Sequence, residues 1–298
     1  MKSKVIVVLG PTASGKSSLA VSLAERFGGE VISADSRQVY TRLNLGTGKI
    51  TKREMRRVPH HLIDVANPKH QFSVAQYKIL AEKALQYTVV QNKLPIIVGG
   101  TGLYIDTLLG TISLPEVPPN PKLRKILAGK SAPMLFSMLQ KLDPTRAKNI
   151  DKHNKVRLVR AIEIAKSIGK VPKTWRKKTP YNVLYIGLNP KNLENRIKKR
   201  LIDRIKKGMI SEVKNLHKHG LSWKRMETLG LEYRYISRYL RGLNTKESMI
   251  AELAKESIKY SRRQMTWFKT NKNIVWFDPT QKQNKAKIEK LLKQFLNT

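Results

Sequence analysis

Short apolar runs alternate with amphipathic stretches along the first hundred residues. The runs at 4–9, 31–34 and 93–98 are rich in valine and isoleucine and end next to glycine or aspartate, which is typical of buried parallel strands. Between them, residues 17–27 and 71–91 have the apolar spacing of helices. This alternation predicts an α/β fold, a parallel sheet flanked by helices, with ligands bound at the carboxyl edge of the sheet.

The pattern changes after residue 114, where the stretch LPEVPPNPK breaks regular structure. Helical periods then dominate until a strand returns at 182–188, followed by further helices to about residue 268, a strand at 273–277 and a lysine-rich terminal helix. We therefore expect a small basic helical insertion domain at 117–179. It would interrupt a catalytic α/β domain formed by 1–116 and 180–298.

Basic residues outnumber acidic ones by 59 to 21, which gives a net charge of +38. The excess is uneven: residues 121–180 hold 17 basic and 3 acidic side chains (+14), whereas residues 1–120 hold 15 and 8 (+7). A field this dense favours a polyanion such as RNA as the partner. A generally lysine-rich proteome would explain the overall excess, but less easily its local density.

Cysteine is absent, which excludes disulfides and thiolate metal sites and fits a cytoplasmic protein. The first apolar run is too short for a signal peptide, and no run approaches the length of a membrane span. We expect a cytoplasmic monomer that does not engage a membrane.

The most specific motif is the phosphate-binding loop GPTASGKS, which follows the first predicted strand and opens a helix. Its backbone N–H groups can surround an anion, Lys16 can reach the outer phosphate and Ser17 can offer a hydroxyl to Mg²⁺. The predicted phosphate-binding residues are Gly10, Pro11, Thr12, Ala13, Ser14, Gly15, Lys16 and Ser17. The motif predicts a bound nucleotide or diphosphate and leaves the reaction open.

An ATPase of the motor type would need an acidic pair after the strand at 93–98, but Gly99, Gly100 and Thr101 follow it. A small-molecule kinase remains possible, since Asp35 follows the second strand and could accept a proton from a nucleophile. Alternatively, Asp35 only caps the turn after it.

Further motifs follow the phosphate loop in the order found in tRNA dimethylallyltransferases, and the chain resembles this family. They are DSRQVY (35–40), LNLGTGK (43–49), PHHLID (59–64), IIVGGTGLY (96–104), NKVRLVRAIEI (154–164), NRIKKRLIDRIKKGM (195–209), TLGLEYR (228–234) and RRQMTWF (262–268). The resemblance covers nearly the whole chain.

The resemblance implies transfer of a dimethylallyl group from dimethylallyl diphosphate to N6 of the adenosine next to the tRNA anticodon (position 37), with release of diphosphate. The phosphate loop would then stabilise the departing diphosphate with Lys16 and Mg²⁺. Asp35 would deprotonate the amine, and Thr101 would contact the RNA near it. The alternative role for Thr101 is that of a helix N-cap alone.

By the same resemblance, Arg200, one helical turn after Arg196, would contact the diphosphate, unless it belongs to a solvated basic face. Asp35, Ser36, Arg37, Gln38 and Thr101 would hold the target base, and Arg157 and Arg160 would bind the anticodon stem-loop. We expect the base to be extruded between the two domains, with Trp175 either stacking on it or packing in the fold. The remaining alternatives are a kinase and an RNA-binding module with a regulatory nucleotide site.

Overall fold

The computed structural model describes residues 2–172 and 177–298, and the chain divides into two compact units. The first, the α/β unit, consists of the chain up to Gly110 and from Lys178 onward. The second, the helical unit, runs from Thr111 to Lys177, close to the span of 117–179 expected for the insertion.

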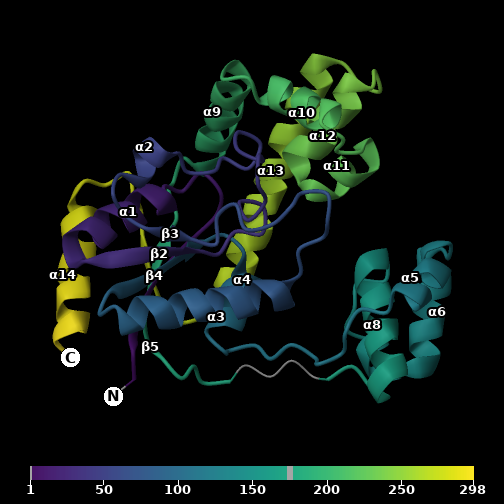
Figure 1. Ribbon diagram of the computed structural model, residues 1–298, viewed down its shortest axis with the longest axis horizontal. Helices are drawn as coiled ribbons and strands as arrows, with labels where there is room; N and C mark the ends of the chain where they lie inside the picture. The colour runs from purple at the N-terminus through teal and green to yellow at the C-terminus, as the bar shows by residue number, and fades with distance from the viewer. Residues whose placement is uncertain (1, 173–176) are drawn as a thin grey trace. The chain divides into compact units, whose positions relative to one another are not determined.

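The α/β unit is built on one sheet of six strands, all parallel, in the order β3-β2-β4-β1-β5-β6 (Figure 1). The strands are β1 Lys4–Leu9, β2 Gly29–Ser33, β3 His60–His61, β4 Leu94–Gly99, β5 Asn182–Leu188 and β6 Ile274–Phe277. This confirms the predicted fold class. The sequence pattern does not predict β3, because two residues are too few to show any period.

The helices of this unit are α1 Lys16–Phe27, α2 Lys52–Met55, α3 Val74–Val90, α4 Gly102–Leu108, α9 Leu193–Lys206, α10 Met209–Lys218, α11 Trp223–Leu229, α12 Leu231–Leu240, α13 Lys246–Phe268 and α14 Gln283–Asn297. The helix expected at 71–91 begins later, at Val74, because Ser73 and Gln76 form a reciprocal capping box there. No helix in the described part of the chain is long and apolar enough to cross a membrane.

Both faces of the sheet are buried, as its continuous apolar runs predict. On β1, Val5 and Val7 belong to one core cluster and Ile6 and Val8 to another, and all four are fully buried. The first cluster includes residues of α3, α4, α10, α12 and α13, and the second includes residues of α1 and α14. Two helical layers therefore hold the sheet rigid between them.

Three neighbouring strands bring the expected site segments to one edge. In the register of the sheet, Leu9 of β1 lies beside Gly99 of β4, and Val98 lies beside Ser33 of β2. The phosphate loop, the Gly99–Gly100 segment and the Asp35 loop follow directly after these residues. The carboxyl edge therefore places all three within reach of one ligand.

The helical unit contains α5 Pro121–Ala128, α6 Ala132–Leu142, α7 Pro144–Ala147 and α8 Lys155–Ile168. Its own small core includes Leu127, Leu135, Leu139, Leu158 and Ile162, which are fully buried. It therefore has the hydrophobic cluster expected of a unit that folds around its own centre.

A buried carboxylate ties this unit together. Glu163 of α8 is 2% exposed and accepts from Arg124 at 2.8 and 2.9 Å, from Arg160 at 2.5 Å and from the amide of Asn120 at 2.5 Å. Burial opposes its ionisation, but the hydrogen bonds from Arg124, Asn120 and Arg160 outweigh it and lower the pKa of Glu163 to about 2. The carboxylate joins α5 and the segment before it to α8.

We predict that Glu163→Gln lowers the free energy of local unfolding of the helical unit by about 2–3 kcal/mol, because both arginines lose a charged partner. Hydrogen exchange of the α8 amides in the full chain measures this. The pKa is lower in the folded than in the unfolded chain, so the stabilisation is complete above about pH 4.5 and is lost as the pH falls toward 2. Glu116→Gln, at an exposed position of the same unit, is the control. Equal exchange rates in both variants would contradict the prediction.

Candidate active site

The phosphate loop has a backbone shaped for an anion. Gly10, Ala13 and Gly15 all have positive φ, and a Cβ on Gly10 would lie 2.3 Å from the carbonyl oxygen of Leu188. Gly15 is the N-cap of α1 and has no side chain to cap the helix. The first amides of α1 are therefore available to an anion at the positive end of the helix dipole.

Lys16 is the cation at the centre of this loop. Its Nζ donates to the carbonyl oxygen of Pro11 at 2.6 Å. Burial and the nearby charge of Arg200 lower the pKa of Lys16 to about 7, and Asp35 opposes this shift only in part. Near pH 7 the Lys16 side chain is therefore present in both its charged and its neutral form, and a bound anion would favour the charged form.

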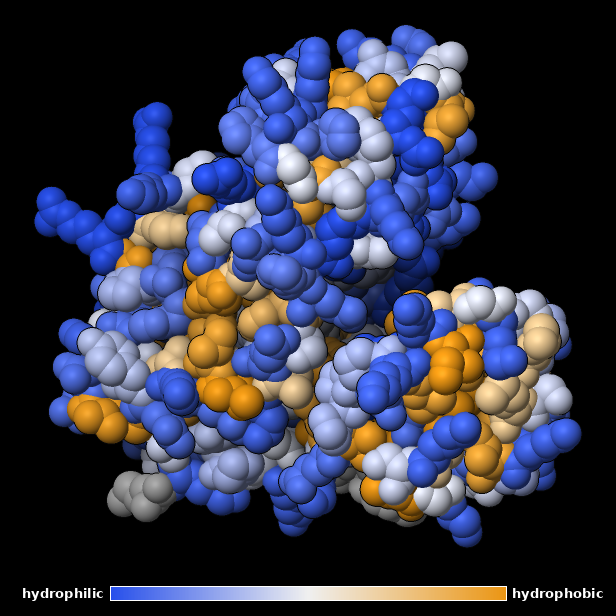
Figure 2. Space-filling view, turned by 45° about the vertical axis from the view of Figure 1, so that its right-hand side comes forward, coloured by the Kyte–Doolittle hydropathy of each residue, from blue (hydrophilic) through white to orange (hydrophobic). Residues whose placement is uncertain are grey.

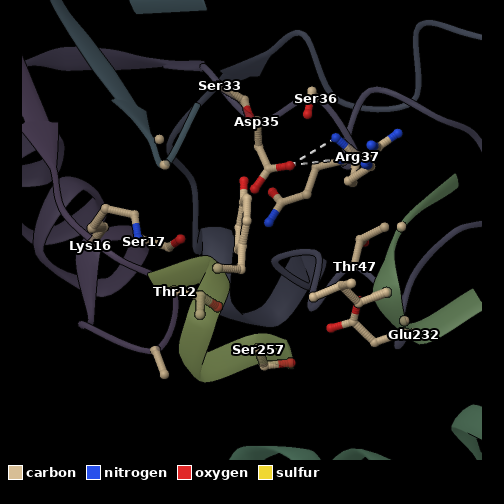
Figure 3. A pocket seen from close by; sticks show the side chains of 18 of the residues that line it. Thr12, Lys16, Ser17, Ser33, Asp35, Ser36, Arg37, Thr47, Glu232 and Ser257 are labelled. Atoms are coloured by element: carbon tan, nitrogen blue, oxygen red, sulfur yellow. Dashed lines mark hydrogen bonds between the residues drawn. The ribbon is translucent and has the colours of Figure 1, made fainter. Parts of the chain in front are cut away.

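Asp35 caps the turn after β2 and also lines a pocket. Its Oδ1 accepts from the amides of Arg37 at 2.8 Å and Gln38 at 3.3 Å, so it caps the turn after β2. The carboxylate also lines a pocket of about 440 Å³ that Lys16 and Ser17 line as well. Figure 3 shows it pointing into the pocket, with Lys16 and Ser17 on one side.

This pocket receives most of the predicted base-holding residues. Ser36, Arg37 and Gln38 line it together with Asp35. Thr101 is not among the described lining residues; instead its Oγ1 accepts from the amide of Ser36 at 3.1 Å. Thr101 occupies the N-cap position of α4, but its side chain makes no capping hydrogen bond. The Thr101 side chain thus holds the Asp35 loop through this hydrogen bond.

Arginines of α9 border the phosphate loop. Arg196 Nε donates to the carbonyl oxygen of Ala13 at 2.9 Å, and Arg200 Nη2 donates to that of Gly48 at 3.0 Å. Burial and the charge of Arg204 lower the pKa of Arg200. Arg200 is therefore part of the site and does not belong to a solvated basic face.

A second pocket of about 680 Å³ is lined by residues of the phosphate loop, α1, the segment 44–56 and α9. The residues common to both pockets are Ala13, Lys16, Ser17, Ile50, Arg200 and Arg204. The two pockets therefore adjoin at the phosphate loop and its cations.

Helix α13 supplies residues that the sequence analysis did not single out. Gln264 Oε1 accepts from the amide of Thr12, and its Nε2 donates to the carbonyl oxygen of Gly100, both at 2.9 Å. It thereby joins the phosphate loop to the loop after β4. Tyr260 lines the pocket, and burial followed by the charge of Asp35 raises its pKa to about 12. Only the RRQMTWF resemblance gave a signal here.

The two arginines predicted to bind RNA from the helical unit differ. Arg157 is exposed. Arg160 is half-buried and donates to Glu163 and, at 2.8 Å, to the carbonyl oxygen of Val117, so part of its guanidinium group is engaged within the helical unit. Trp175 lies outside the described residues. Figure 2 shows hydrophilic side chains over most of the visible surface, with apolar patches among them.

Comparison with known proteins identifies a family. The family model described as IPP transferase matches residues 38–271. The tRNA dimethylallyltransferase of Anoxybacillus flavithermus is 38% identical over 287 residues, covering 94% of this chain and 92% of the relative. The tRNA dimethylallyltransferase 2 of Treponema denticola is 43% identical over 275 residues, covering 90% and 92%.

Solved structures agree. The tRNA isopentenylpyrophosphate transferase of Bacillus halodurans superposes with a TM-score of 0.76 at 35% identity, covering 99% of this chain and 97% of that one. A eukaryotic dimethylallyltransferase whose structure is described as acting on tRNA superposes with a TM-score of 0.76 at 25% identity, covering 93% and 74%.

We predict that inorganic diphosphate binds more weakly as the pH rises above 7. A bound anion raises the pKa of Lys16 from about 7, so binding takes up a proton, and the affinity falls by up to about tenfold per pH unit above that value. Calorimetric titrations between pH 6 and 9 measure this. Lys16→Arg stays charged throughout and should keep only the slope that comes from the titration of diphosphate itself. Identical slopes in both proteins would contradict the prediction.

Proposed function

The chain belongs to the IPP transferase family, and we propose that it transfers a dimethylallyl group from dimethylallyl diphosphate to N6 of the adenosine next to the tRNA anticodon, position 37, releasing diphosphate. One observation carries this proposal: Lys16 of the phosphate loop and the Asp35 carboxylate line one pocket from opposite loops. The pocket thus combines a cradle for a leaving anion with a group that can accept a proton.

The reaction needs stabilisation of a leaving group rather than activation of water. The amine nitrogen attacks the allylic carbon, the carbon–oxygen bond breaks, and diphosphate leaves with the electron pair. The amides at the start of α1, Lys16 and Arg200 face the charge that builds on it. Because this charge is greater in the transition state than in the bound donor, fixed positive groups lower the barrier.

Asp35 is proposed to take the proton from the amine. Its Oδ1 is held by two amides, so the carboxylate has a fixed orientation in the pocket. Ser36, Arg37 and Gln38 would hold the extruded base, and Thr101 would act by fixing the amide of Ser36. Extrusion is required because the amine must reach the phosphate loop inside the protein.

Magnesium fits the site through Ser17. Its side chain lines both pockets next to Lys16. Among the described residues, no group of three or more His, Asp or Glu side chains could hold a metal ion, so the phosphates and water would supply the other ligands. We propose that Ser17 holds Mg²⁺, which when bound would neutralise charge on the diphosphate.

We propose that the chain works as a monomer. Because tRNA is the substrate, we place the reaction in the cytoplasm. The anticodon stem-loop is the proposed contact of the helical unit, through the exposed Arg157.

We predict that Asp35→Asn slows prenyl transfer by a factor of about 10²–10⁴ and leaves tRNA affinity within about twofold of the unmodified chain. The asparagine oxygen can still accept from Arg37 and Gln38, so the turn persists while the base is lost. Single-turnover transfer to unmodified tRNA, with dimethylallyl diphosphate and Mg²⁺, measures the rate by mass gain on the RNA.

Glu247→Gln, an exposed carboxylate at the start of α13, is the control for the loss of one negative charge. Transfer by Asp35→Asn at most of the original rate would refute the base assignment. Turnover of ATP in place of the prenyl donor would refute the proposed reaction and favour a kinase.

We predict that Arg157→Ala weakens tRNA binding and reduces the slope of log K against log salt by about 0.7–1, as expected for one lost phosphate contact. Arg160→Ala should mainly destabilise the helical unit, because that side chain is held by Glu163. Binding titrations between 50 and 300 mM salt, with hydrogen exchange in parallel, separate the two effects. An unchanged slope in Arg157→Ala would remove this residue from the interface.

A further inference from the structure

One carboxylate of α10 organises the backbone of the loop at 44–48. Glu212 Oε2 accepts from the amides of Asn44 at 3.1 Å and Leu45 at 2.7 Å. Its Oε1 accepts from the amide of Gly46 at 3.0 Å and from the Tyr233 hydroxyl at 2.8 Å. All four partners are neutral donors, and an amide side chain could not accept from all of them, since it has only one oxygen.

Besides donating to Glu212, Tyr233 fixes the position of the loop at 44–48 by packing against it. Its side chain is 1% exposed, and a Cβ on Gly46 would lie 2.4 Å from its ring carbon Cζ. Only glycine therefore allows the loop to approach the ring this closely. The loop is held against α12 by packing and against α10 by the carboxylate.

Carbonyl groups of the same loop accept hydrogen bonds from the arginines of α9. Arg204 Nη1 donates to Leu45 and Gly46 at 3.1 and 3.0 Å, and Arg200 Nη2 donates to Gly48 at 3.0 Å. Gly48 has a φ of +59°, and a Cβ there would lie 2.2 Å from Arg200 Nη2. With amides toward Glu212 and carbonyls toward the arginines, the loop forms an oriented layer between an anion and two cations.

We propose that Glu212 is a positioning residue for the donor diphosphate. It orders the loop at 44–48 and so holds the Arg200 guanidinium beside the phosphate loop. Arg200 lines both pockets together with Lys16, so the position of Arg200 affects how tightly the phosphate loop binds an anion. The inference rests on the proposed function, in which that anion is the diphosphate of the prenyl donor.

The test measures binding of inorganic diphosphate with Mg²⁺ to the full chain by calorimetry. Glu212→Gln should weaken this binding about tenfold and raise the KM for the prenyl donor, while tRNA affinity stays within about twofold. Glu212→Asp should restore part of the affinity. Tyr233→Phe, which removes one of the four hydrogen bonds and keeps the ring against Gly46, should have a smaller effect in the same direction.

A double-mutant cycle with Arg200→Ala separates positioning from a general loss of structure. If Glu212 acts through Arg200, then adding Glu212→Gln to Arg200→Ala should change diphosphate affinity by less than about twofold. Glu256→Gln, a carboxylate of α13 that pairs with Lys259, is the matched control and should leave diphosphate binding unchanged.

Two failures are distinguishable. If the unmodified chain does not bind diphosphate, the proposed function falls and takes this inference with it. If the unmodified chain binds diphosphate and Glu212→Gln binds it equally well, or loses the same tenfold in the Arg200→Ala background, the positioning role is refuted and the proposed function stands.

Discussion

The structure depends on a geometric constraint, namely that parallel strands all end at the same edge of their sheet. With β2, β4 and β1 adjacent, the Asp35 loop, the Gly99–Gly100 turn and the phosphate loop must meet there. The Asp35 carboxylate and the phosphate loop, separated in the sequence, therefore line one pocket. The buried residues on both faces of the sheet stabilise this arrangement, so the loops of the site are anchored on rigid strands and helices.

Bringing cations together at this edge has an electrostatic cost, which the anion relieves. Lys16 and Arg200 are both buried enough to lower their pKa values, and each lies near another positive charge. In the proposed reaction, binding of diphosphate would offset this repulsion, and the gain would be largest when the charge on diphosphate is greatest. The same cations would then favour the departing diphosphate over the intact donor.

Local pattern was enough to predict five of the six strands, the loop between β1 and α1 and the position of Asp35 directly after β2, because each depends on residues next to one another. Gln264 and Glu212 were not predicted, because they reach the loops from α13 and α10 and bind backbone groups, which leave no trace in side-chain pattern. The internal role of Arg160 did have a local signal, since Glu163 lies three residues later on the same helix. The pair was not predicted, because the excess of positive charge around Arg160 favoured an RNA contact for this side chain.

Several of the few acidic side chains have structural roles. Glu163 accepts four hydrogen bonds within the helical unit, Glu212 accepts four from the loop at 44–46 and Tyr233, and Glu227 lies within 4 Å of three arginines of α12 and its end. These acidic side chains organise segments of the fold. Because the chain has only 21 acidic residues against 59 basic ones, its net charge remains +38 even though these carboxylates are ionised, and a field of this sign attracts a polyanion such as RNA.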